Sequence, residues 1–245
     1  MKKFLLAMLV VLTTAVSSVA IAQSAKSGDK KVDDKVEATL RARFAERVGT
    51  QPDSIARMPF GLYEVVVGGD IFYVDAKVDY LVMGRVFDTR NREDITQKRK
   101  DEILKVDFKS LPLERAVKTV RGDGSRQLVV FADPNCGYCK ALEKTLAGMK
   151  NITVYTFLYP ILSKDSLEKS KNVWCAKDRS KAWNEMMLNG KAPAAAECDA
   201  SVLQANLELG QKLSVSGTPT VIAPNGQRAP GAVPAEHLEA MLAGK

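Results

Sequence analysis

The spacing of apolar residues changes along the chain, and the first regular stretch has the period of a helix. Val36, Leu40, Phe44 and Val48 recur every four residues, which places them on one face of a helix spanning 36–48. Two aspartates directly before this stretch are suited to capping its first turn. The sequence therefore predicts an amphipathic helix here.

The next stretch has the composition of β-strands. Three segments are rich in β-branched and aromatic residues and predict an antiparallel meander: 62–67, 71–75 and 80–87. Gly68-Gly69 predicts a hairpin turn, and Pro52 and Pro59 predict a loop before the sheet. A unit of about 60 residues with so small a sheet has a thin core and open edges, so we expect it to pair with a second copy.

A strongly charged segment, 91–105, follows the predicted sheet. Its apolar residues are Ile95, Ile103 and Leu104, and the rest is dominated by acidic and basic side chains. A helix this polar bridges domains through solvent or lies on the surface of one domain. The contrast between the sequences on its two sides favours a linker over 91–107, between an N-terminal domain at 23–90 and a second domain at 108–245.

In the second domain, strands alternate with helices. Strands are predicted at 127–132, 152–158 and 220–223, and helices at 112–120, 136–149, 167–187, 200–213 and from Pro234 onward. Turns are predicted at Gly122-Asp123-Gly124 and Pro224-Asn225-Gly226. This alternation favours an α/β fold around a mixed sheet.

The first 22 residues have the pattern of a cleavable signal peptide. Lys2 and Lys3 precede an apolar run over 4–16, and Ala20-Ile21-Ala22 offers small residues for cleavage. The run is too short for a spanning helix, which argues against an uncleaved anchor. We expect export and a mature chain that begins near Gln23.

The charge of the chain does not indicate a nucleic-acid partner. Removing Lys2 and Lys3 with the signal peptide lowers the formal net charge from +7 to +5. The excess is mixed with acidic residues, and no basic stripe is interleaved with aromatic residues. We therefore expect no nucleic-acid binding.

The four cysteines, Cys136, Cys139, Cys175 and Cys198, form one close pair and one wide pair. Export places them in an oxidising compartment, where disulfides persist. Four cysteines allow three pairings, but a Cys-x-x-Cys motif is a redox unit in its own right. This pattern favours two separate pairs.

The close pair has the setting of a redox site. Cys136 follows a predicted strand and opens a predicted helix, where backbone amides and the helix dipole favour a thiolate and should lower its pKa. Cys139 is one turn deeper, so we expect Cys136 to attack and Cys139 to resolve. The intervening Gly137-Tyr138 lacks a histidine, which suggests a strong but not extreme oxidant. A zinc site would need a second tight pair, and the single histidine, His237, is distant, so we expect no metal and no cofactor.

Two further features lie downstream. Cys175 and Cys198 can close a loop of about 24 residues, a bridge that stabilises by roughly 3 kcal/mol. A second redox pair is the less favoured alternative, because the spacing lacks the strand–helix setting. Thr218-Pro219 precedes a predicted strand, where a cis proline would be rare and significant.

The chain resembles the DsbC-type disulfide isomerases of the Gram-negative periplasm over nearly its whole mature length. Three segments carry the resemblance: Phe131-Ala132-Asp133-Pro134-Asn135-Cys136-Gly137-Tyr138-Cys139, Val173-Trp174-Cys175-Ala176-Lys177-Asp178 and Val215-Ser216-Gly217-Thr218-Pro219. Residues 61–88 are similar to the family's dimerisation sheet. Ser110-Leu111-Pro112 departs from the family pattern where the linker meets the second domain.

The resemblance implies a thioredoxin-like catalytic domain joined by a helical linker to a small α+β dimerisation domain, in a V-shaped homodimer. It implies a cis Pro219 packed against the catalytic pair, with Thr218, Gly137 and Tyr138 also contacting substrate. It implies that Cys175–Cys198 is the structural disulfide. The expected substrates are misfolded exported proteins in the periplasm, and the expected reductant is a membrane thiol reductase of the DsbD type.

The expected activity is isomerisation of wrong disulfides by thiol–disulfide exchange. Two alternatives stay open: a DsbG-like reductase of cysteines oxidised to sulfenic acid, and a holdase chaperone whose cleft matters more than its thiols.

Overall fold

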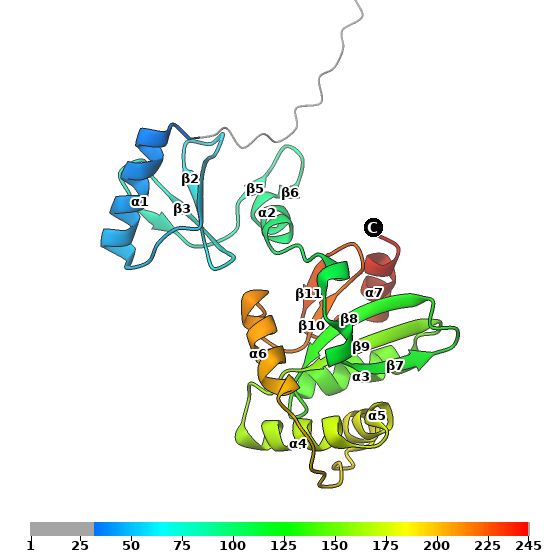
Figure 1. Ribbon diagram of the computed structural model, residues 1–245. Coiled ribbons are helices and arrows are strands. Elements are labelled where there is room, and N and C mark those ends of the chain that lie inside the picture. The colour runs from blue at the N-terminus through cyan, green and yellow to red at the C-terminus, as the bar shows by residue number, and fades with distance from the viewer. Residues whose placement is uncertain (1–31, 245) are drawn as a thin grey trace, which may run out of the picture.

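The structure, a computed structural model, describes residues 32–244 and shows two domains joined by a short helix (Figure 1). The expected signal peptide, 1–22, and the start of the mature chain at Gln23 lie outside the described residues. Among the residues that are described, no helix combines the length and the apolar character needed to cross a bilayer.

The N-terminal domain begins with helix α1, Asp34–Val48. The Asp33 carboxylate accepts hydrogen bonds from the first-turn amides, and Gly49 ends the helix with a φ of 82°. Leu40 and Phe44 are buried against the sheet, which confirms the helix and the middle of its apolar stripe, but Val36 and Val48 at its two ends are exposed.

The sheet beside α1 is antiparallel, with strand order β1-β2-β3-β4. Its strands are Ser54–Arg57, Tyr63–Val67, Asp70–Val74 and Leu81–Val82. Gly68 and Gly69 both have positive φ, as a tight hairpin turn requires, and this confirms the predicted turn. The loop predicted around Pro52 and Pro59 was wrong in part, because β1 lies between these prolines, where Ile55 is buried.

The third predicted strand, 80–87, is interrupted. Within 80–87, β4 is the part that pairs with β3. A separate hairpin of β5 (Phe87–Asp88) and β6 (Glu93–Asp94) follows and precedes helix α2 (Ile95–Ile103). The Asp94 side chain caps α2 by accepting a hydrogen bond from the Gln97 amide. The predicted helix over 91–105 is therefore shorter at both ends.

Helix α2 does not run through solvent alone; it packs on the N-terminal sheet. The hydroxyl groups of Tyr73 and Thr96 are 2.7 Å apart, and both residues are buried. Arg99 forms an ion pair of 3.0 Å with Glu64, which is 1% exposed. These buried polar contacts join the linker helix to the N-terminal domain.

At its far end, the linker contacts the C-terminal domain. The turn at Gly69 lies against Leu104, close enough that a Cβ at position 69 would be 2.6 Å from the Leu104 Cδ2 atom and 3.7 Å from the Ser214 Cβ atom. The Val106 amide donates a hydrogen bond of 3.1 Å to the Gly226 carbonyl. Both domains therefore meet at the end of α2.

The C-terminal domain is built on a five-stranded mixed sheet of order β11-β10-β8-β9-β7. The strands are Val117–Arg121 (β7), Arg126–Ala132 (β8), Ile152–Leu158 (β9), Thr220–Ile222 (β10) and Arg228–Pro230 (β11). Only the β8–β9 pair is parallel. The helix predicted over 112–120 was wrong: a single 3-10 turn, Leu113–Arg115, precedes β7. A second 3-10 turn, Phe108–Ser110, comes before it.

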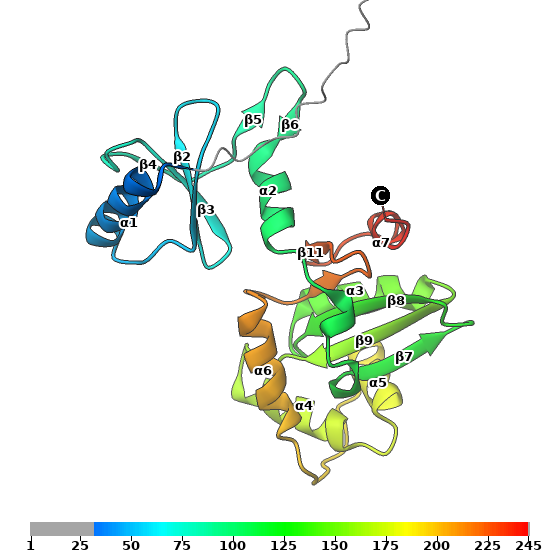
Figure 2. The same ribbon diagram turned by 45° about the horizontal axis from the view of Figure 1, so that its top comes forward.

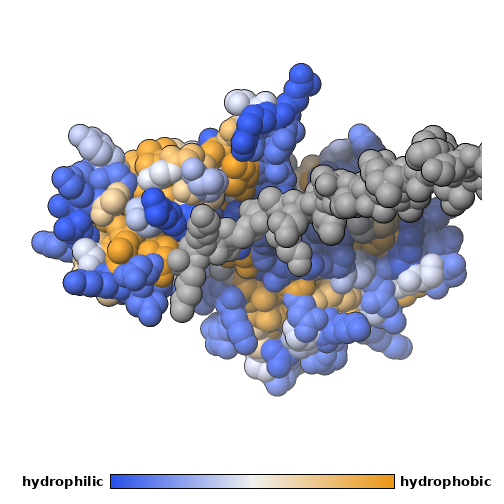
Figure 3. Space-filling view, turned by 90° about the horizontal axis from the view of Figure 1, so that it is seen from above, coloured by the Kyte–Doolittle hydropathy of each residue, from blue (hydrophilic) through white to orange (hydrophobic). Residues whose placement is uncertain are grey.

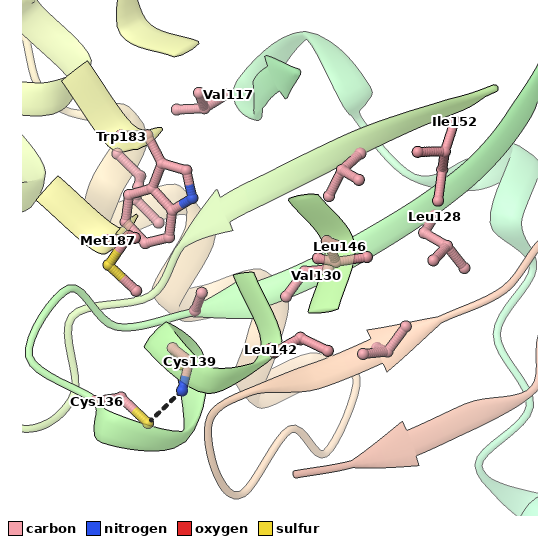
Figure 4. Close-up of a cluster of buried hydrophobic side chains, with 14 of the residues drawn as sticks. Val117, Leu128, Val130, Cys136, Cys139, Leu142, Leu146, Ile152, Trp183 and Met187 are labelled. Atoms are coloured by element: carbon pink, nitrogen blue, oxygen red, sulfur yellow. Dashed lines mark hydrogen bonds between the residues drawn. The ribbon is translucent and has the colours of Figure 1, made fainter. Parts of the chain in front are cut away.

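Helices cover both faces of this sheet (Figures 1 and 2). They are α3 (Gly137–Gly148), α4 (Lys164–Cys175), α5 (Arg179–Asn189), α6 (Val202–Lys212) and α7 (Ala235–Leu242). The expected single helix over 167–187 is two helices, because Asp178 caps a new one. The larger core contains Leu142, Leu146 and Trp183, which Figure 4 labels, and also Leu238 from α7. A second core contains Phe131 and Phe157.

Candidate active site

Cys136 is at the junction between the central strand and α3. Strand β8 is buried from Leu128 to Ala132, and Cys136 is the N-cap residue of α3. Its Sγ atom accepts a hydrogen bond of 3.3 Å from the Cys139 amide (Figure 4), and its own amide donates to the Asp133 carbonyl at 3.1 Å. A sulfur held at a helix N-terminus is placed where the helix dipole and free amides favour negative charge.

The two sulfurs differ in burial. The Cys136 residue is 6% exposed and Cys139 is 1% exposed, and both are free thiols in the structure. Burial raises the pKa of the Cys139 thiol well above its usual value. Cys139 is therefore placed beneath Cys136 and stays protonated at neutral pH.

The segment containing Pro219 lies directly over the pair. The Thr218–Pro219 peptide bond is cis, and the Cys136 thiol donates a hydrogen bond of 3.3 Å to the Thr218 carbonyl. The Gly231 amide donates to the Pro219 carbonyl at 2.7 Å, and the Tyr159 hydroxyl to the Val215 carbonyl at 3.1 Å. These bonds fix both ends of the segment, so residues 82 positions apart in the sequence meet at one sulfur.

Asp133 organises the loop before Cys136, and the sequence analysis did not single it out. Its fully buried carboxylate accepts hydrogen bonds from the Asn135 amide (2.8 Å), the Leu162 amide (3.0 Å) and the Ser166 hydroxyl (2.8 Å). These partners join the end of β8 to the loop after β9 and to α4. An aspartate three residues before the motif was the available signal, but two of its three partners, Leu162 and Ser166, are about 30 residues away.

Asn135, next to the catalytic sulfur, bonds to the same region. Its Nδ2 atom donates to the Asp165 carboxylate at 2.7 Å and to the Ser163 and Ser166 hydroxyls, and its Oδ1 atom accepts from the Lys169 ammonium at 2.8 Å. The loop that carries Cys136 is thus held against the first turn of α4. This fixes the direction of the sulfur before any substrate arrives.

A second buried acid, Glu143, lies one turn beyond Cys139 on α3. It accepts a hydrogen bond of 2.7 Å from the Trp183 indole, and the Arg121 guanidinium is 3.9 Å away. Burial raises the pKa of this carboxyl group, and these two neighbours only partly offset the effect. Glu143 therefore holds α3 and α5 together through a buried polar contact.

The wide cysteine pair forms a disulfide of its own and does not bond to either cysteine of the close pair. Cys175 at the end of α4 is joined to Cys198 by a disulfide with a Cα–Cα distance of 5.5 Å. Arg179 stacks on the neighbouring Trp174 ring, 3.5 Å from its centre.

His237 is exposed on α7. No group of three or more His, Cys, Asp or Glu residues within 32–244 is arranged to hold a metal ion.

Comparisons with known proteins agree with this geometry. Residues 113–244 match the thioredoxin-like domain family, and residues 20–97 match the disulfide bond isomerase protein N-terminal domain. The chain is 47% identical over 220 residues to the probable thiol:disulfide interchange protein DsbC of Bordetella pertussis, covering 89% of this chain and 77% of the relative. The chain belongs to the DsbC family. It is a thiol:disulfide oxidoreductase.

Two further proteins are similar to this chain over most of their own length. DsbC of Escherichia coli K12 is 28% identical over 225 residues, covering 89% of this chain and 91% of the relative. The crystal structure of a disulfide interchange protein from Neisseria gonorrhoeae is 38% identical, with a TM-score of 0.52, and covers 55% of this chain and 97% of its own. The expected fold is therefore confirmed: an antiparallel N-terminal domain of the DsbC type, a helix, and a thioredoxin-like domain.

Proposed function

We propose that this DsbC-family enzyme isomerises wrong disulfides in exported proteins, in the periplasm. The observation that carries the proposal is the arrangement at Cys136: its sulfur is held at the start of α3 against the Thr218 carbonyl, and the more deeply buried Cys139 lies behind it. The Cys136 sulfur is thus placed to react with a substrate, and the Cys139 sulfur is placed to react with Cys136 afterwards.

The chemistry follows from that arrangement. The Cys136 thiolate attacks one sulfur of a substrate disulfide, a new S–S bond forms to the enzyme, and the other substrate sulfur leaves as a thiolate. This thiolate attacks a second substrate disulfide, whose displaced sulfur then attacks the mixed disulfide and releases Cys136 as a thiolate. If release stalls, Cys139 loses its proton and displaces the substrate, and the enzyme leaves as a Cys136–Cys139 disulfide.

The residues around the sulfur have separate proposed roles. The substrate backbone lies along Thr218 and Pro219, and Gly137 and Tyr138 flank the reacting sulfur. Cys175–Cys198 is structural and takes no part in turnover. A DsbD-type membrane thiol reductase, which reduces Cys136–Cys139 when it forms, is the proposed partner that returns the enzyme to its working state.

We also propose that the enzyme acts as a homodimer joined through the N-terminal sheets. β4 is one of the two edge strands of this sheet, and Tyr80, Leu81, Val82 and Met83 on and around it are exposed. Figure 3 shows hydrophobic surface gathered on this domain. A second β4 would satisfy the open edge and cover these side chains.

The test is reactivation of ribonuclease with scrambled disulfides in a weakly reducing buffer. Wild-type enzyme should restore ribonuclease activity, and Cys136→Ala should restore none above the buffer rate. Cys175→Ser/Cys198→Ser, measured at a temperature where it stays folded, serves as a control that removes cysteines without touching the site. Equal recovery with Cys136→Ala would overturn the mechanism. No recovery with folded, reduced wild type would shift the assignment to a sulfenic-acid reductase or a holdase.

A further inference from the structure

We infer that an apolar ledge beside Cys136 selects substrate cysteines that have an apolar neighbour in the chain. The ledge consists of Tyr138 on the first turn of α3 and of Ile161 and Leu162 in the loop between β9 and α4. This inference rests on the attack by Cys136 proposed above and adds a sequence preference to it.

The ledge residues are apolar and largely open to solvent. Tyr138 is 71% exposed, Ile161 41% and Leu162 55%, although the residues just before the loop, Leu158 and Tyr159, are buried. Scattered apolar residues on a surface need no explanation, but apolar residues beside a reacting atom become covered whenever a substrate binds.

The ledge is fixed to the catalytic loop by hydrogen bonds. The Leu162 amide is bonded to Asp133, and Ser163 and Ser166 on its far side are bonded to Asn135. Asp133 and Asn135 lie within three residues of Cys136, so the ledge keeps its place relative to the sulfur. Binding to it costs little ordering of the enzyme.

The position of the sulfur determines what can occupy the ledge. Cys136 is only 6% exposed and is bonded to the Thr218 carbonyl, so a substrate disulfide must approach closely across the surface between the Pro219 segment and the first turn of α3. An extended peptide that places its cysteine there also passes over neighbouring side chains. Asp165 and Lys169 on the adjoining α4 are paired with each other at 2.6 Å, so these two charges are already satisfied.

The occupant is therefore an extended, unfolded segment of substrate polypeptide with an apolar side chain within a few residues of its cysteine. Such side chains are buried in native proteins and accessible in misfolded ones. The ledge would favour cysteines that belong in a core over cysteines that belong on a surface.

The experiment compares two synthetic peptides that differ only in the residue before cysteine, leucine or serine, each supplied as its symmetric disulfide dimer. The rate of reaction with reduced enzyme is measured at low peptide concentration. Each rate is divided by the same variant's rate with bis(2-hydroxyethyl) disulfide, so that changes in Cys136 reactivity cancel. Wild type should prefer the leucine peptide by about fivefold, the scale expected for covering part of one leucine side chain.

Leu162→Ser removes the side chain but keeps the backbone bond to Asp133, and its preference should fall to about twofold or less. Val120→Ser is the matched control: Val120 is 52% exposed on β7 and pairs with Thr153 at the opposite end of the sheet from Cys136, so its preference should equal that of wild type. An unchanged preference in Leu162→Ser, or an equal loss in Val120→Ser, would overturn the inference. Failure of wild type to react with the small disulfide would instead overturn the proposed function.

Discussion

The backbone amide of Leu162 donates a hydrogen bond of 3.0 Å to the buried carboxylate of Asp133, three residues before Cys136. This bond connects two loops that leave adjacent parallel strands, β8 and β9. The loop that precedes Cys136 is therefore held by its neighbour in space and not by its own sequence alone.

Asp133→Ala should destabilise the protein. It leaves two backbone amides and the Ser166 hydroxyl without their acceptor, and each unsatisfied buried donor costs about 1–3 kcal/mol, so a loss of about 3 kcal/mol is expected after partial relaxation. Urea unfolding measures the loss. Asp133→Asn keeps one acceptor oxygen and should lose less than Asp133→Ala. A loss below about 1 kcal/mol for Asp133→Ala would show that water replaces the carboxylate.

Cys139 should resist alkylation in the folded, reduced enzyme. Burial raises its pKa, so the thiol stays protonated as the pH rises through 8, and the protonated form does not react. Iodoacetamide treatment followed by mass spectrometry should find Cys136 modified and Cys139 intact. Repeating the treatment on Cys136→Ala removes any shielding by a modified Cys136. Rapid native-state modification of Cys139 in that variant would contradict its burial.

Glu143→Gln should change the pH dependence of stability. The pKa of Glu143 is raised by burial, so its folded form binds a proton more tightly than the unfolded chain does. Its contribution is fully present below the unfolded value of about 4.5 and is lost as the pH rises through the folded-state pKa. Glutamine can still accept the Trp183 hydrogen bond but has no proton to lose.

The stability of Glu143→Gln relative to wild type should therefore increase between pH 4.5 and pH 8. Denaturant unfolding of both proteins at the two pH values tests this. Glu185→Gln, a partly exposed position on α5 that is paired with Lys191, is the control for removing an acid. The same difference in unfolding free energy at both pH values would mean that Glu143 ionises normally.

Val82→Asp should weaken the proposed dimer. Two copies of β4 would bring two carboxylates together at the edge of the joined sheet, and like charges placed opposite one another are destabilising. Sedimentation at micromolar concentration should show a dimer for wild type and mainly a monomer for the variant. Val120→Asp changes an exposed valine on the other domain and should leave the mass unchanged. A monomeric wild type would overturn the dimer proposal.

The local structure around Cys136 and Cys139 was predictable because its signals are local. A buried strand, a cysteine in the N-cap position and an apolar helical face lie within about 20 consecutive residues, and α3 begins one residue after the predicted start. The β9 strand, Ile152–Leu158, was predicted with the observed bounds for the same reason.

The errors lie where local and tertiary signals disagree. Leu113–Arg115 forms a single helical turn. On β7, which follows it, Val117 and Thr119 are buried and the residues next to them are more exposed, which is the period of two that a strand has. The prediction of a helix over 112–120 overlooked this period. Asp133 looks like a loop residue in the sequence, because its role depends on Leu162 and Ser166, far along the chain. Contacts of this kind leave no periodic pattern to find.

The Cys175–Cys198 bridge makes this enzyme a product of the same kind of reaction that it carries out. Cys198 is exposed, and Cys175 is partly buried. Under the proposed function, an exported chain acquires this bond by oxidation while its Cys136–Cys139 pair is kept reduced. The proposal therefore requires opposite redox outcomes for two cysteine pairs of one polypeptide, and these pairs differ in their surroundings.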